Sequence, residues 1–152
     1  MIEFTPIESP LDTHVRVPGS KSLTQRALIA AALAEGESTL IGPLASEDTH
    51  YTITALRQMG VAIDDSNPEA WQVSGCAGQI QTPTEDIFLG NNGTATRFLT
   101  SVAALGQGRF RITGGDRMTQ RPIAPLMQAL QGWAYWCRSI LGRLRTSSLG
   151  NL

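Results

Sequence analysis

The pattern of apolar and polar positions predicts short strands that alternate with helices along the 152 residues. Four helices are expected at 22–35, 46–58, 93–105 and 122–131, each with a glycine close to its end. The first three open with a polar turn, and Pro122 fits the first turn of the fourth. Strand-like stretches lie at 2–7, 13–17, 38–41, 61–64, 71–74, 86–89 and 109–113. This order predicts an α/β or α+β domain.

The first helix combines an apolar body with a cationic start. Residues 27–34 are eight apolar residues in a row, which favours a helix buried on every side. Its opening turn carries Lys21 and Ser22, and Arg26 follows on the same face. A helix start offers unpaired N–H groups and partial positive charge, so this turn suits an anion. An ordinary serine-capped helix with solvated charges explains the stretch equally well.

Two later segments repeat this arrangement. Residues 89–99 lead from a strand end through Gly93 into a helix start that carries Arg97. In residues 114–122, two arginines flank another helix start, and arginine suits bidentate capture of carboxylate or phosphate. Alternatively, the first segment is a capped glycine turn, and Asp116 in the second pairs with an arginine. Three cationic helix starts together predict a site for a small, multiply anionic substrate.

Composition narrows the possible functions. With 41% hydrophobic and 16% charged residues the chain is globular, and its net charge of −1 gives no argument for nucleic acid. No apolar run is long enough for a membrane helix, and the N-terminus lacks a signal pattern. Two isolated cysteines fit the reducing cytoplasm, and His14 and His50 have no metal-ligand spacing. We therefore expect a cytoplasmic protein without a metal, and without nucleic-acid or membrane partners.

Two nucleotide-binding motifs are missing from the chain. Ser20 and Val15 occupy the positions where a P-loop would need glycines, which argues against an ATPase. No Gly-x-Gly-x-x-Gly pattern follows a strand. One internal echo is present, because 38–60 and 109–132 both run from a strand through a glycine turn to a helix. A repeated supersecondary unit would explain that echo.

Three motifs, taken together, suggest a family. They are Pro18-Gly-Ser-Lys-Ser22 with Arg26, Leu89-Gly-Asn-x-Gly-Thr-Ala-x-Arg97, and Asp116-Arg-Met-x-x-Arg-Pro-Ile123. In order and spacing they resemble the 5-enolpyruvylshikimate-3-phosphate (EPSP) synthases, over about residues 1–131. The UDP-N-acetylglucosamine enolpyruvyl transferases are the alternative, but they carry Ala-Lys-Asn where this chain has Ser20-Lys21-Ser22.

The resemblance implies an activity, a 3-phosphoshikimate 1-carboxyvinyltransferase of the shikimate pathway. Such an enzyme moves the enolpyruvyl group of phosphoenolpyruvate to the 5-hydroxyl of shikimate 3-phosphate, releases phosphate and needs no cofactor. By matched position, Lys21 is the catalytic candidate and contacts both substrates, while Ser22 and Arg26 hold shikimate 3-phosphate. Gly93 and Arg121 hold phosphoenolpyruvate. Further candidates from the second motif are Asn91, Thr94 and Arg97.

The resemblance also implies a fold that this chain fills only in part. Family enzymes have two domains, each built from three βαβαββ units. We expect about one unit and much of a second here. Residues 1–20 would be strands of the other domain, and 21–132 would begin the substrate-binding domain. The full-length form is expected to be a monomer, and this chain alone is expected to lack turnover. A non-catalytic anion-binding module is the competing hypothesis.

Two features depart from the family pattern. Asn92 replaces a small alanine and Phe98 a proline, both beside the expected phosphoenolpyruvate site. The composition also changes near residue 132. Residues 133–152 contain three arginines and no acid, whereas residues 1–132 have a net charge of −4. We expect 133–152 to be an atypical tail that is not family sequence.

Overall fold

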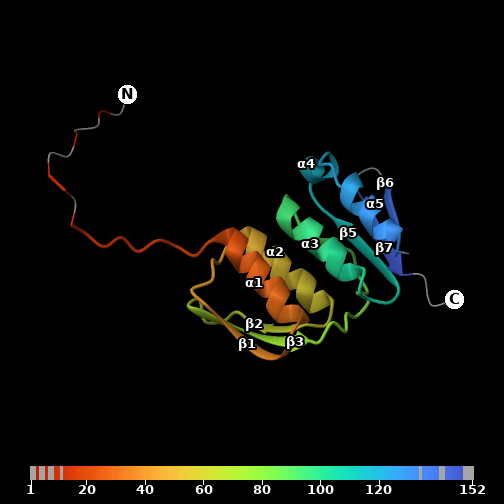
Figure 1. The fold of residues 1–152 in the computed structure, drawn as a ribbon, viewed down its shortest axis with the longest axis horizontal. Coiled ribbons are helices and arrows are strands. Elements are labelled where there is room, and N and C mark those ends of the chain that lie inside the picture. Colours follow the sequence, from red (N-terminus) through yellow and green to blue (C-terminus); the bar gives the residue numbers. More distant parts are fainter. Residues whose placement is uncertain are drawn as a thin grey trace.

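Helices and two small sheets make up the computed structural model, which describes residues 3, 6, 9–10, 12–133, 135–140 and 143–148 (Figure 1). The helices are α1 (Lys21–Leu33), α2 (Glu47–Gln58), α3 (Gly93–Ala103), α4 (Asp116–Thr119) and α5 (Ala124–Gly132). The strands are β1 (Glu35–Ile41), β2 (Ala62–Asp64), β3 (Ala70–Cys76), β4 (Ile87–Phe88), β5 (Arg109–Thr113), β6 (Tyr135–Ile140) and β7 (Arg143–Ser148). No helix among the described residues is both long and apolar enough to cross a membrane.

Side-chain caps start the three longer helices where the sequence predicts them. The Ser20 side chain accepts a bond from the N–H of Leu23 at the start of α1. Ser46 and Thr49 form a reciprocal capping box at α2. At α3 the buried Asn92 side chain accepts a bond of 3.0 Å from the N–H of Ala95. Such caps satisfy backbone donors that a helix start leaves unpaired.

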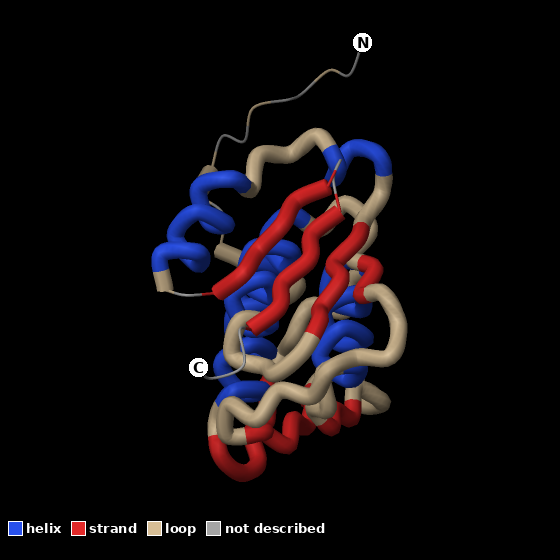
Figure 2. Tube along the Cα trace, turned by 90° about the vertical axis from the view of Figure 1, so that its right-hand side faces the viewer, coloured by secondary structure: helices blue, strands red, loops and turns tan. Residues whose placement is uncertain are grey.

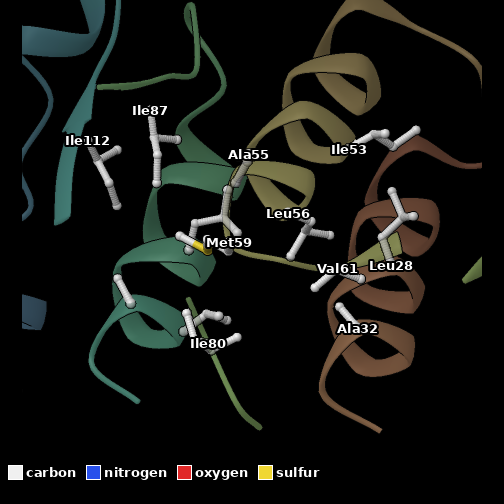
Figure 3. Close-up of a cluster of buried hydrophobic side chains, with 14 of the residues drawn as sticks. Leu28, Ala32, Ile53, Ala55, Leu56, Met59, Val61, Ile80, Ile87 and Ile112 are labelled. Atoms are coloured by element: carbon white, nitrogen blue, oxygen red, sulfur yellow. The ribbon is translucent and has the colours of Figure 1, made fainter. Parts of the chain in front are cut away.

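Among the described residues, the buried apolar side chains form one core between the helices and the sheets. Leu28 of α1, Leu56 of α2 and Leu99 of α3 are fully buried in it. Figure 3 shows this cluster, with Leu28 and Ala32 of α1 at one side, residues of α2 in the middle, and Ile87 of β4 and Ile112 of β5 at the other side. Burying one such side chain contributes about 1.5–3 kcal/mol, so this packing holds the helix starts in place.

The two sheets share one topology. Antiparallel pairing gives the order β1-β3-β2 in the first sheet and β5-β7-β6 within the second. In the first, β1 and α2 precede the antiparallel pair β2–β3, and in the second, β5 and the helices α4 and α5 precede the antiparallel pair β6–β7. The second sheet has one more member, since β4 lies parallel to β5. Figure 2 looks onto this second sheet, with the strands of the first at the lower end of the view. The internal repeat expected from the sequence is therefore present.

Several boundaries differ from the sequence-based predictions. Residues 13–17 are not a strand but an exposed extended segment, because no neighbouring strand pairs with them (Figure 1). Most of the strand expected at 2–7 lies outside the described residues. The last helix begins at Ala124, with Pro125 rather than Pro122 in its first turn, and the short α4 precedes it.

The prediction that the first helix is buried on every side was wrong. Ala27 and Ala30 are exposed, and Leu23 retains 68% of its accessible surface. The opposite side of α1 packs into the core through Leu28, Ala31 and Ala32. An apolar helix thus has one apolar side without a covering element among the described residues.

The backbone of the tail takes part in the second sheet. β6 and β7 form an antiparallel pair, and β7 continues the sheet beside β5 from Arg109 to Ile112. The sequence of this stretch has no regular apolar pattern, so these two strands were not predicted. Whether residues 133–152 are family sequence stays a prediction.

Candidate functional site

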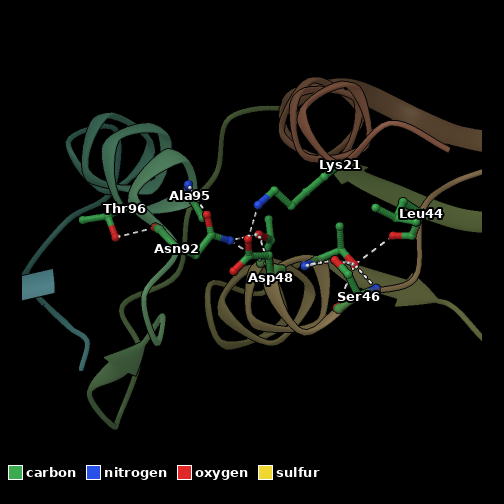
Figure 4. A network of polar contacts seen from close by, with 9 residues as sticks. Lys21, Leu44, Ser46, Asp48, Asn92, Ala95 and Thr96 are labelled. Atoms are coloured by element: carbon green, nitrogen blue, oxygen red, sulfur yellow. Dashed lines mark hydrogen bonds and ion pairs between the residues drawn. The ribbon is translucent and has the colours of Figure 1, made fainter. Parts of the chain in front are cut away.

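The first turns of α1, α2 and α3 meet at one end of the helix layer. Lys21 begins α1, Asp48 lies in the first turn of α2, and Asn92 caps α3 (Figure 4). Hydrogen bonds join all three, so the convergence is fixed by contacts and not only by packing. Three helix starts together concentrate partial positive charge, which favours an anion at this end of the molecule.

Lys21 is held by a carboxylate on the neighbouring helix. Its Nζ lies 2.6 Å from Oδ2 of Asp48, and the two side chains are 50% and 27% exposed. An ion pair this exposed contributes at most about 1 kcal/mol to stability. Its main effect is to orient the lysine ammonium while leaving it accessible to solvent and to a ligand.

Asn92 ties α3 to α2 from inside the protein. Its side chain is 3% exposed, and its Nδ2 donates to the backbone carbonyl of Asp48 at 2.8 Å. The same amide accepts from Ala95 N–H, so one side chain both caps α3 and fixes its distance from α2. An alanine at this position could do neither. The departure from the expected motif at position 92 is therefore a structural link in this chain.

Gly93 and two arginines form the second part of the site. A Cβ atom placed on Gly93 would lie 2.5 Å from Nη1 of Arg121 and 3.3 Å from Nη1 of Arg97. Arg97 is held by bonds to the carbonyls of Gly93 at 3.1 Å and Pro122 at 2.9 Å. The α3 start and the loop before α5 therefore present two guanidinium groups around a residue with no side chain.

Arg26 of α1 reaches α3 beside Arg97, at Phe98. Its guanidinium carbon sits 5.3 Å from the centroid of the Phe98 ring, and its Nη1 donates to the carbonyl of Ser22 at 2.8 Å. The contact between a cation and an aromatic face holds Arg26 over α3. Phe98, the second departure from the expected motif, thus provides the support for a predicted substrate ligand.

The glycine turn before α3 rests on an aromatic side chain. A Cβ on Gly90 would lie 2.5 Å from Cε2 of Tyr51, and the Tyr51 ring meets Phe88 edge to face at 5.6 Å. The Tyr51 hydroxyl donates to Glu47 at 2.9 Å. This bond to a carboxylate raises the pKa of Tyr51 above its ordinary value, with desolvation as the next cause, so the hydroxyl stays a donor.

The predicted residues occupy one face of the molecule, at or near these helix starts. Lys21, Ser22, Arg26, Arg97 and Arg121 are all exposed. Asn91 lies against Gly115 of the neighbouring loop, and Thr94 is half-buried in the first turn of α3.

The sequence missed Asp48 and the structural role of Asn92, although Asp48 stood out as an acid in a helix first turn. Among the described residues, His, Cys, Asp and Glu side chains form no group of three or more that could hold a metal.

Comparison with known proteins decides the family. The model of the family EPSP synthase (3-phosphoshikimate 1-carboxyvinyltransferase) matches residues 6–137. The chain belongs to the EPSP synthase family. All three motifs, and every site residue named above, fall inside the span that the family model matches.

Relatives of this EPSP synthase family member agree in sequence and in fold. The 3-phosphoshikimate 1-carboxyvinyltransferase of Rhizobium leguminosarum is 48% identical over 130 residues, which cover 86% of this chain and 31% of that protein. The enzyme of the same name from Pseudomonas savastanoi is 48% identical over 126 residues, covering 83% and 30%. An EPSP synthase structure from Acinetobacter baumannii matches with a TM-score of 0.82 at 25% identity, over 88% of this chain and 31% of that one.

This family member contains only part of the sequence of its relatives, so only part of the site can be described from it. The chain spans about a third of the length of the relatives it matches. Within that third, the α/β fold and the family recognised from the three motifs are confirmed. Within that part, the site consists of the starts of α1, α2 and α3 together with the exposed side chains of Arg26, Arg97 and Arg121.

Proposed function

We propose that this chain forms part of the substrate site of a 3-phosphoshikimate 1-carboxyvinyltransferase of the shikimate pathway. The whole enzyme would transfer the enolpyruvyl group of phosphoenolpyruvate to the 5-hydroxyl of shikimate 3-phosphate and release phosphate. The observation that carries the proposal is the convergence of α1, α2 and α3 on one cationic face, with the family motifs on it. Both substrates are polyanions, which suits a cationic face. The proposed compartment of the enzyme is the cytoplasm.

The proposed roles are those that the family motifs imply by matched position, and the places of the groups in the fold support them. Lys21, oriented by Asp48 between two helix starts, would contact both substrates. Ser22 and Arg26 lie in the first two turns of α1, joined by a bond from Arg26 Nη1 to the Ser22 carbonyl, and would hold shikimate 3-phosphate. Each of these groups is a donor or a cation and stabilises negative charge as it shifts between the reactants.

Phosphoenolpyruvate would bind at the other half of the face. Gly93 leaves room for Arg121 beside the α3 start, and an anion there could meet the guanidinium and the helix end together. Arg97 is the third donor at this position, with Asn91 and Thr94 as additional candidates. The lysine and three arginines of this face would supply the positive charge for both substrates.

Calorimetry with the two substrates tests the proposal. Titration of shikimate 3-phosphate, alone and then with phosphoenolpyruvate, should give a heat of binding that Lys21→Ala and Arg121→Ala abolish. Arg109→Ala is the matched control, because it removes the same charge from β5, away from the helix starts. Equal affinity in the parent and in both site variants, measured also in a full-length relative, would contradict the assignment.

The competing function, a stand-alone anion-binding module, predicts a different selectivity among anions. Such a module would bind inorganic phosphate or sulfate as tightly as shikimate 3-phosphate, since only charge would be recognised. The substrate site should prefer shikimate 3-phosphate, because Ser22 and Arg26 add donors for its ring and phosphate. Competition between the two anions in the same calorimeter separates these alternatives.

A further inference from the structure

Arg26 has no acidic partner among the described residues. No carboxylate there forms an ion pair with it, whereas Lys21 lies 2.6 Å from Asp48. Its Nη1 donates to the Ser22 carbonyl, and its Nε and Nη2 have no hydrogen bond to the described part of the chain. A guanidinium offers five N–H donors, so most of those of Arg26 are available to an anion.

An aromatic ring, rather than a carboxylate, holds this guanidinium. The guanidinium carbon of Arg26 lies 5.3 Å from the centroid of the Phe98 ring. Such a contact attracts the cation through the electron-rich face of the ring, without an oxygen acceptor. An aromatic support therefore orients an arginine without neutralising its charge. A carboxylate in the same place would compete with an anionic ligand for the same donors.

The helix that carries Phe98 is itself fixed in position. Phe98 is half-buried on α3, next to the fully buried Leu99. The buried Asn92 side chain caps this helix and also donates to the carbonyl of Asp48 on α2. Packing and a buried amide therefore hold the ring where it can define the position of a long arginine side chain.

Corresponding positions of the two repeats supply the cation and the ring. The offset between the caps Ser20 and Asn92 equals the offset between Arg26 and Phe98. The two residues therefore stand at the same point of α1 and α3, the equivalent helices of the two repeats. Their contact links the two helix starts across the site.

This contact places Phe98 in a different half of the site from the one that its motif suggested. The motif put residue 98 beside the expected phosphoenolpyruvate site. In the fold its ring contacts Arg26, a candidate ligand of shikimate 3-phosphate. Arg121 and Arg97 are the nearest neighbours of Gly93. Different residues of α3 thus serve the two halves.

We propose that Phe98 is a positioning residue, which holds Arg26 for shikimate 3-phosphate and takes no direct part in binding phosphoenolpyruvate. The inference rests on the proposed function, in which Arg26 binds the first of these substrates. Because the ring holds the guanidinium before the substrate arrives, less side-chain entropy is lost on binding. Removing the ring should therefore weaken one substrate and leave the other unchanged.

Calorimetry on the 152-residue chain gives the first test. Phe98→Leu removes the ring but keeps an apolar side chain that favours a helix, and it should weaken shikimate 3-phosphate binding about fivefold. Phe98→Tyr keeps the ring and should bind within about twofold of the parent. Trp133→Leu removes an exposed ring at the end of α5 and is the matched control, which should bind like the parent.

The second substrate is titrated with shikimate 3-phosphate at saturation. Under this condition phosphoenolpyruvate should bind the Phe98→Leu variant as it binds the parent. A loss confined to phosphoenolpyruvate would overturn the proposal and return residue 98 to the other half of the site.

Two measurements show whether Phe98 acts through Arg26. In an Arg26→Ala background, Phe98→Leu should cause no further loss of shikimate 3-phosphate affinity. In NMR spectra without substrate, the ring current should move the side-chain N–H signal of Arg26 upfield in the parent and in Phe98→Tyr. This shift should disappear in Phe98→Leu, which tests the contact independently of any ligand.

The outcomes separate this inference from the proposed function. Binding that Arg26→Ala weakens and Phe98→Leu does not would overturn the positioning role alone. Equal losses from Phe98→Leu with and without Arg26 would also overturn it, since the ring would then act by another route. A parent chain that gives no heat of binding, or binding indifferent to Arg26→Ala, would overturn the proposed function and this inference with it.

Discussion

At the scale of single residues, the space beside Gly93 and the unpaired buried amide of Gln25 have measurable consequences. The guanidinium of Arg121 occupies the space that a side chain at position 93 would need. Gln25 of α1 is 1% exposed, and neither the oxygen nor the nitrogen of its amide has a hydrogen-bond partner within the described part of the chain. The first residue leaves room for a functional group, and the second costs stability because a buried amide is left unpaired.

Gly93→Ala should weaken phosphoenolpyruvate binding by about tenfold, which corresponds to about 1.4 kcal/mol. The added methyl group would displace the Arg121 guanidinium from the start of α3. Calorimetry in the presence of shikimate 3-phosphate measures the change. Gly132→Ala adds the same methyl where nothing lies within 4 Å and should bind like the parent. Unchanged affinity in Gly93→Ala would show that Arg121 does not hold this substrate.

Gln25→Met should raise the free energy of unfolding by about 1 kcal/mol, since a side chain of similar length replaces an unpaired buried amide. Urea denaturation followed by circular dichroism provides the measurement. Gln128→Met, on the exposed side of α5, is the control and should change stability little. A loss of stability in Gln25→Met would mean that the amide has a partner that supports the fold.

At the scale of elements, three helix starts depend on their caps to different degrees. The Ser20 cap bond is 3.4 Å long and exposed, whereas Ser46 shares a two-way capping box. Asn92 is buried and bonds to two elements. The cost of removing a cap should therefore rise from α1 to α3.

Asn92→Ala should lower the free energy of unfolding by about 2 kcal/mol, more than Ser46→Ala at about 1 kcal/mol, with Ser20→Ala lowest. The Asn92 change removes a cap and also the bond from Nδ2 to the Asp48 carbonyl that links α3 to α2. Chemical denaturation of the three variants under one condition ranks them. If Ser20→Ala proved the most damaging, the α1 start would depend on its cap more than its geometry indicates.

Local signals account for most of what the sequence predicted. Caps, glycine stops and polar first turns placed α2, α3 and β5 within a few residues, because these signals act inside each element. Pairing partners were not visible, so 13–17 was wrongly assigned as a strand, and the tail strands were missed. The motifs singled out Lys21, Gly93 and Arg121, whose roles in the site stay predictions. The roles of Asp48 and Phe98 depend on contacts between helices that spacing alone does not encode.

At the scale of the whole molecule, the cationic face is open to solvent. Its lysine and arginines are exposed, and the chain spans about a third of the length of its relatives. Charge stabilisation in catalysis is strongest where water is excluded, and this face alone excludes little.

We therefore expect this chain alone to make no 5-enolpyruvylshikimate 3-phosphate. Phosphate release should stay at the level of a substrate-free blank when both substrates are supplied. The full-length 48% identical relative serves as the positive control in the same assay. Release above the blank that disappears in Lys21→Ala would contradict this expectation and would mean that the face is sufficient for turnover.

The first sheet bears on folding during synthesis, because all its strand pairs lie between Glu35 and Cys76. A ribosome releasing the chain from the N-terminus delivers β1, β2, β3 and both covering helices before any residue of α3. Leu28 and Leu56 pack in the same core as Leu99 and Ile112, so this side of α1 and α2 stays uncovered until α3 and β5 have been synthesised. The nascent first repeat is thus a paired sheet with an uncovered apolar side, which exposes it to chaperones until the second repeat emerges.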